Sequence, residues 1–188
     1  RTPRVHDEDS RLLVMFEGSA AVIDRATRDL RSALGKCGIA ETMLFDGTAA
    51  ASVLQDTIDA YIEPVGDRSI TYRSTGLPST IWPRAMAACE IVRECGAPCD
   101  VIADICTGDA IVRIASSSAK NAADLLPGLD ARLRSALPTM SVLAGDPRLR
   151  ALVDAWAGVP PTLETLRAIK TRFDPSAILA PGRYVGGL

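Results

Sequence analysis

The chain has 188 residues, of which 47% are hydrophobic, so it can bury one sizeable core, whereas two small domains would each be marginal. Its formal net charge is only -2, and because charges of both signs are interspersed, we expect no nucleic-acid or membrane-surface partner. No stretch approaches the roughly 18 apolar residues of a membrane helix, and the start lacks the apolar core of a signal peptide. We therefore expect a cytoplasmic protein with a flexible tail over residues 1–10.

The first part of the chain has a strand, helix, strand pattern. A nearly continuous apolar run over residues 11–17 predicts an inner strand, and apolar residues recur at helical spacing over residues 22–34. Residues 39–45 predict a second strand, which Asp-Gly ends. An alanine-rich pattern then predicts a helix over residues 48–62, followed by a loop over residues 63–67.

A similar pattern follows in the middle of the chain. Residues 70–74 are rich in β-branched and aromatic side chains and predict a strand. The next helix is expected to carry Pro83 in its first turn, where the missing N–H has no cost, and to stop at Gly96. Residues 101–106 and 110–115 predict two strands joined by a short hairpin connector.

The last third predicts two helices and one strand. A leucine stripe over residues 125–137 predicts a helix that Pro127 would split or kink, and residues 140–144 predict a strand. A final helix is predicted over residues 163–173, and Asp174 with the proline after it would end that helix. These elements favour an α+β fold with a mostly antiparallel sheet made of two ferredoxin-like halves and covered by helices. A doubly wound parallel sheet is the alternative.

No self-sufficient catalytic or metal site is evident in the sequence. The only histidine is His6, in the charged tail, so we expect no catalytic residue of the histidine-base type. Four cysteines are close in sequence, but they form no CxxC pair and no histidine is near them, so we expect reduced thiols in apolar surroundings and no metal. These are Cys89, Cys95, Cys99 and Cys106. Phosphate-binding glycine motifs of the dinucleotide or Walker type are also absent from the sequence.

The C-terminus carries the most specific pattern. Residues 169–183 read IKTRFDPSAILAPGR. This run resembles the closing signature of FAD-linked oxidases of the vanillyl-alcohol oxidase type: a lysine, then DP, an apolar pair and NPGR. Residues 13–19, followed by the predicted helix, resemble the first strand and helix of the same family's C-terminal domain. Between these two ends the match is one of pattern only.

The resemblance implies a domain organisation. Residues 11–173 would be a C-terminal cap domain that covers the reactive face of FAD, and residues 174–188 a tail that packs toward a flavin domain missing from this chain. FAD is then expected in the complete protein and not on this fragment alone. The expected partners are an N-terminal FAD-binding domain, together with catalytic flavin and iron-sulfur subunits. The charged start without methionine also leads us to expect further sequence upstream.

The resemblance also assigns residues to the cofactor. Pro181, Gly182 and Arg183 fall on its PGR and would face the flavin domain, with Arg183 as an electrostatic or hydrogen-bonding anchor. Ala180 stands where the family usually has asparagine, so a side-chain amide contact is absent at that position.

The absence of the family's histidine-rich motifs suggests which branch of the family is closest. Catalytic members carry histidine-rich motifs in this domain, whereas the accessory FAD-binding subunit of glycolate oxidase lacks them, as this chain does. The implied role is to cover flavin and to shape a 2-hydroxy acid site without catalysis by the fragment itself. Arg73 and Arg113, on predicted strands, are the candidates to bind a substrate carboxylate. The alternative is a free-standing ferredoxin-like binding or assembly module.

Overall fold

A computed structural model describes residues 11–39, 41–62, 69–115, 119–156 and 158–188. The chain divides into two compact units between Ile58 and Asp59. The expected flexible tail over residues 1–10, with His6, and the expected loop over residues 63–67 lie outside the described residues. Nowhere in the described ranges is a helix both long enough and apolar enough to cross a membrane.

The first unit contains two helices and no strand among its described residues. The predicted helices are confirmed as α1 (Ala20–Lys36) and α2 (Gly47–Ile62), the second of which runs across the unit boundary. The strands predicted over residues 11–17 and 39–45 are wrong where the structure describes them, because both runs lack secondary structure and are exposed. In a strand, the backbone N–H and C=O groups find hydrogen-bond partners only when another strand lies beside it.

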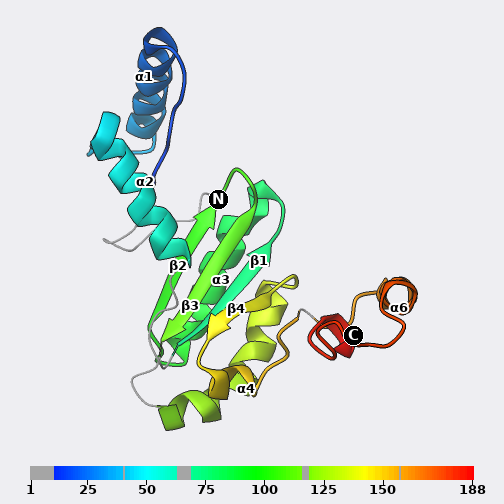
Figure 1. Ribbon diagram of the computed structural model, residues 1–188. Coiled ribbons are helices and arrows are strands. Elements are labelled where there is room, and N and C mark those ends of the chain that lie inside the picture. The colour runs from blue at the N-terminus through cyan, green and yellow to red at the C-terminus, as the bar shows by residue number, and fades with distance from the viewer. Residues whose placement is uncertain (1–10, 40, 63–68, 116–118, 157) are drawn as a thin grey trace. The chain divides into compact units, whose positions relative to one another are not determined.

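The second unit is built on one four-stranded sheet. Its strands stand in the order β2-β3-β1-β4, and every neighbouring pair is antiparallel (Figure 1). In chain order the elements are β1 (Ser69–Thr75), α3 (Pro78–Glu94), β2 (Cys99–Asp104), β3 (Asp109–Ala115), α4 (Ala119–Ala136), β4 (Ser141–Gly145), α5 (Pro147–Arg150), α6 (Leu163–Phe173) and a final 3-10 turn at Val185–Gly187. This β-α-β-β-α-β order is the ferredoxin-like arrangement. The α+β prediction with an antiparallel sheet is confirmed, although the described strands build one such half.

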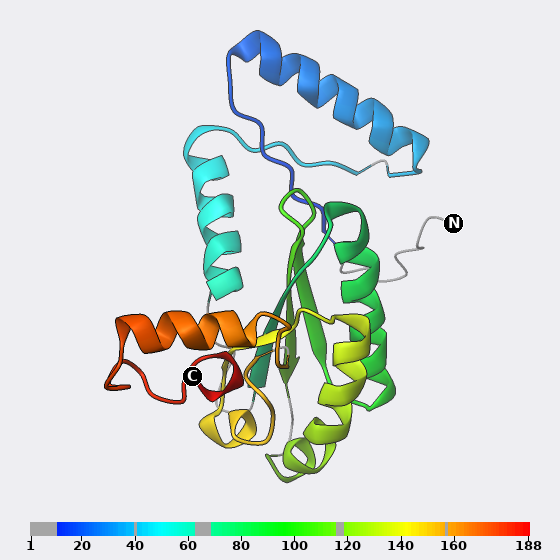
Figure 2. The same ribbon diagram turned by 90° about the vertical axis from the view of Figure 1, so that its right-hand side faces the viewer.

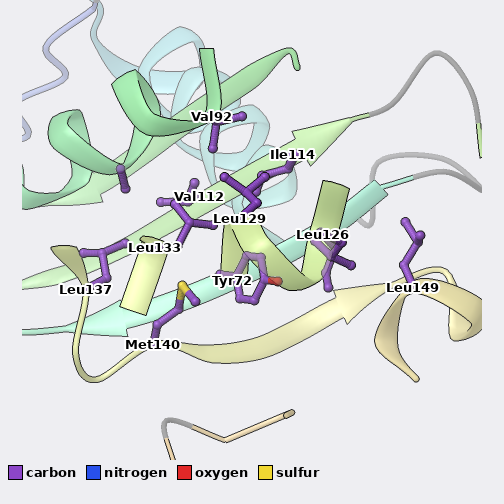
Figure 3. Packing of buried hydrophobic residues seen from close by; sticks show 12 residues of the cluster. Tyr72, Val92, Val112, Ile114, Leu126, Leu129, Leu133, Leu137, Met140 and Leu149 are labelled. Atoms are coloured by element: carbon purple, nitrogen blue, oxygen red, sulfur yellow. The ribbon is translucent and has the colours of Figure 1, made fainter. Parts of the chain in front are cut away.

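Helices α3 and α4 lie together on one face of the sheet (Figure 2). Apolar side chains of β1 and β3 pack there against the two helices, and Tyr72 lies among leucines of α4 (Figure 3). The buried cluster consists of Ile70, Tyr72, Ala88, Val92, Val112, Ile114, Leu126, Leu129, Leu133, Leu137, Met140 and Leu149. Because residues alternate between faces along a strand, Thr71, Arg73, Ile111 and Arg113 belong to the opposite face.

Both helices tolerate an internal proline. α3 begins at Pro78, which places Pro83 in its second turn and not in the first turn as predicted. Because Pro83 has no N–H, the carbonyl four residues before it lacks its helical hydrogen-bond donor. That carbonyl lies in the first turn of α3, near the N-terminus of the helix. α4 continues through Pro127, so of the two outcomes predicted for this helix, a split or a kink, the split is wrong. The predicted hairpin between β2 and β3 is confirmed.

Candidate functional site

The C-terminal signature forms a folded turn. Its centre is the Asp174 carboxylate, which accepts hydrogen bonds from the backbone N–H groups of Ile178 at 2.9 Å and Leu179 at 3.0 Å. Lys170, one turn earlier in α6, donates its Nζ to Asp174 Oδ2 and to the Leu179 carbonyl, both at 2.7 Å. The Lys170 ammonium, followed by the two backbone amides, lowers the pKa of Asp174. The turn is therefore held by charge-assisted hydrogen bonds of its own residues.

Two alanines of this turn have left-handed backbone conformations. The φ angles are 50° at Ala177 and 45° at Ala180. Such angles are unfavourable for a residue with a Cβ, and asparagine adopts them more readily than alanine. Position 180 is the one where the resembled signature has asparagine. Two hydrogen bonds to Asp174 hold the strained turn closed: the Ala177 N–H donates to its carbonyl at 3.0 Å and the Ile178 N–H to its carboxylate at 2.9 Å.

Two of the three residues predicted to contact the cofactor line an open hollow of about 800 Å³. Gly182 and Arg183 contribute to its wall, and Pro181 is exposed directly before them. The Trp156 Nε1 donates to the Arg183 carbonyl at 3.3 Å, and its ring meets Tyr184 edge-on at 5.2 Å between centroids. The Arg183 guanidinium is exposed, and its side chain makes no hydrogen bond or ion pair with the described residues.

The opposite wall of the hollow is fixed to α4 by Arg134. Its guanidinium pairs with Asp130 through Nε at 2.7 Å. The two terminal nitrogens donate to the carbonyls of Trp156 at 2.7 Å and Asp154 at 2.6 Å. One arginine thus joins the helix behind the sheet to the segment on which the signature tail rests. Arg150 and Arg183 lie on the wall of the hollow together with Asp154, so its described lining has two cationic residues and one acidic residue.

The two arginines predicted to bind a substrate carboxylate differ in their surroundings. Arg73 already holds a carboxylate, because its Nε lies 3.0 Å from both oxygens of Asp109 and its Nη2 lies 2.8 Å from Oδ2. Arg113 is buried, with 8% of its surface exposed, and its Nε and Nη2 make no hydrogen bond. The two lie on the same sheet face, which makes Arg113 the one with unfilled donors.

The cysteines form no metal centre in the part of the chain that the structure describes, where no three His, Cys, Asp or Glu side chains gather closely enough to hold an ion. All five are free thiols. Cys89 is buried, with its Sγ 3.8 Å from the Cys99 carbonyl. Burial, followed by the neighbouring Cys89 thiol, raises the pKa of Cys99, which keeps that thiol protonated.

Large apolar side chains project from the signature turn. Phe173 is 80% exposed, Ile178 74% and Leu179 61%, although Asp174 and Lys170 hold the backbone of Ile178 and Leu179. The sequence predicted that the helix ends at Asp174 and that a tail follows, but the hydrogen bonds that close this turn were missed. The signal was available, because a lysine four residues before an aspartate at a helix end is the spacing of a side-chain pair.

Comparisons with known proteins identify no relative. No model of a known protein family matches the chain, and neither the curated proteins nor the solved structures contain a match.

Proposed function

We propose that this chain is the C-terminal cap domain of an FAD-linked oxidase of the vanillyl-alcohol oxidase type, similar to the accessory FAD-binding subunit of glycolate oxidase. Its role would be to cover flavin and to shape a site for a 2-hydroxy acid, in the cytoplasm. The observation that supports this most is the signature turn. A terminal segment with the family's motif is folded by its own hydrogen bonds and presents apolar side chains outward.

The residues at the hollow fit such a role. FAD carries negative charge on its diphosphate, and the exposed Arg183 guanidinium stands beside an open surface with Arg150. Bound FAD would supply the acceptor for the hydride of the 2-hydroxy acid, which carries both electrons of the oxidation, while the hydroxyl proton leaves separately. The chain's own residues would exclude water from the flavin face and orient the tail through Asp174. Its partners would be a flavin domain, together with catalytic flavin and iron-sulfur subunits.

The test is flavin absorbance. Residues 1–188 are expected to be colourless, whereas the protein read from its natural start is expected to carry bound FAD. In that longer protein, Arg183→Met should lower FAD retention during dialysis, while Arg167→Met, an exposed arginine of α6 paired with Glu164, should not. A longer protein without flavin would refute the cap-domain proposal.

A second candidate is a free-standing binding or assembly module. The observation that favours it is the completeness of the β-α-β-β-α-β unit, which has its own buried core between the sheet and two helices. A flavin-free protein from the natural start that binds a protein partner through this unit would support the module.

A further inference from the structure

One edge of the sheet has no backbone partner among the described residues. β2 is the outermost strand on that side (Figure 1). At the opposite edge, Val142 of β4 donates its N–H to the Ala155 carbonyl at 2.8 Å, so a later segment of the chain covers part of that edge. An open strand edge presents N–H and C=O groups to which another extended chain can bond.

The register shows which backbone groups of β2 point away from the sheet. The Ala115 N–H donates to the Pro98 carbonyl at 3.2 Å, and these two residues continue the β2–β3 ladder by one pair. Hydrogen-bonded pairs alternate along an antiparallel ladder, so Val101 and Ala103 have their N–H and C=O groups on the outer side of β2. In the part of the chain that the structure describes, no group bonds to them there.

The side chains of β2 differ between the two faces of the sheet. Val101 and Ala103 pack against the core beneath the helices. Because side chains alternate along a strand, Asp100, Ile102 and Asp104 project from the opposite face. Asp100 and Asp104 are exposed. A strand added beside β2 would therefore meet an acidic, an apolar and a second acidic side chain in turn.

The neighbouring strand β3 leaves both carboxylates available. Asp100 lies opposite the buried Arg113, and no ion pair joins the two within the described ranges. Asp104 lies opposite Asp109, which is paired with Arg73 instead. A cation on an added strand would be a direct cross-strand partner for each of the two exposed carboxylates.

The same charges disfavour a second copy of this strand as the occupant. Symmetric antiparallel pairing of two β2 strands, centred on Ile102, would place Asp100 opposite Asp104 of the second copy at both ends. Like charges directly opposite each other destabilise a sheet, whereas a basic strand would form ion pairs at both positions. The edge of β2 is therefore open to one kind of partner and opposed to self-pairing.

We infer that the outer edge of β2 binds a basic, extended segment of a partner protein. The segment adds a fifth, antiparallel strand to the sheet through the outward N–H and C=O groups of Val101 and Ala103. It carries basic side chains opposite Asp100 and Asp104 and an apolar side chain between them. In strand addition of this kind, main-chain hydrogen bonds give affinity and alternate side chains give specificity. The inference rests on the sheet alone and not on the proposed function.

The test is titration of residues 1–188 at low salt with the peptide acetyl-Thr-Lys-Thr-Val-Thr-Lys-Thr-amide. Hydrogen exchange followed by NMR should slow in a saturable way at the Val101 and Ala103 amides and change little at Ile102, whose N–H faces β3. The same peptide with glutamate in place of lysine should bind at least about tenfold more weakly. N-methylation of the two threonines that flank valine should abolish binding, because it removes the N–H groups that face β2.

The carboxylates are tested by the double variant Asp100→Asn with Asp104→Asn. It should weaken binding of the lysine peptide about tenfold, as expected for the loss of two cross-strand ion pairs. The asparagine amide oxygen can still accept the two backbone N–H groups that Asp104 now holds in the hairpin turn. The matched control, Asp124→Asn with Glu164→Gln, removes the same charge from exposed positions on α4 and α6 and should bind like the wild type.

The backbone contact is tested by Ala103→Pro. Proline removes an N–H that points outward, so the ladder to β3 should remain while peptide binding is lost. If this variant does not fold, the N-methylated peptide tests the same contact. Absence of saturable slowing in the wild type, equal binding of the glutamate or N-methylated peptide, or unchanged binding in the double variant overturns the inference. Protection of the Val101 and Ala103 amides that rises with protein concentration alone also overturns it, because a second copy would then occupy the edge.

Discussion

Replacing Arg134 with methionine should destabilise the second unit and release the wall of the hollow. The substitution keeps much of the side-chain length but removes every donor. It leaves the Asp130 carboxylate and the carbonyls of Asp154 and Trp156 without the nitrogens that now bind them. Both the helix α4 and the segment beneath the signature tail lose their connection.

The magnitude follows from the burial of the pair. Removing one partner of a fully buried ion pair costs about 3–5 kcal/mol, because the other charge is left unpaired. The side chains of Arg134 and Asp130 are 21% and 12% exposed, so water can reach part of the pair. We therefore expect Arg134→Met to lower the free energy of unfolding by about 2–4 kcal/mol, after this discount for solvent screening.

Urea denaturation followed by circular dichroism measures this loss. With a slope of about 2 kcal/mol per molar urea, the midpoint should fall by about 1–2 M. Arg132→Met is the matched control on the same helix, since its ion pair with Glu94 is exposed and should contribute only a small fraction of that effect. Adding Asp130→Asn to Arg134→Met should recover part of the loss. A midpoint for Arg134→Met within error of the control would refute the reasoning.

Gly108→Ala should lower the free energy of unfolding by more than about 2 kcal/mol in the same urea assay, because φ is +76° and a Cβ would collide with the Gly76 carbonyl. The lowered pKa of Asp174 means that its stabilisation of the turn is complete above about pH 4 and is lost as the pH falls through the lowered folded-state value. Hydrogen exchange should therefore show protection factors for the Ile178 and Leu179 amides that fall in acid. Iodoacetamide at pH 8 should label the exposed Cys106 quickly and Cys99 slowly, as measured by mass spectrometry, because burial raises the pKa of Cys99.

The fold was predictable from the sequence where an element's partners are close along the chain. Periodicity and turn residues predict the hairpin of β2 and β3 and the helices α3 and α4. The hairpin belongs to the one described sheet. The runs at residues 11–17 and 39–45 have the composition of strands but form none where described. Composition indicates that a segment can be a strand, whereas the hydrogen-bonding neighbour that makes it one is a property of the tertiary structure.

The site was predictable only in outline. Arg73 and Arg113 look alike in sequence, since each is a cation on a predicted strand. What separates them is the antiparallel register, which places Asp109 within reach of Arg73 and Thr71 opposite Arg113. Without the register of the strands, the sequence does not show which arginine is paired with a carboxylate and which is not.

The order of the signature tail has a consequence for the proposed function. The turn from Lys170 to Leu179 is closed by its own hydrogen bonds, so the backbone that carries its exposed side chains is held in one conformation before any partner arrives. A backbone that is already ordered loses little conformational entropy on docking. More of the free energy gained by burying Ile178 and Leu179 then stabilises the complex. A loose terminus would lose that entropy on binding. Under the proposed function, this turn is the surface of the chain that would dock on the flavin domain.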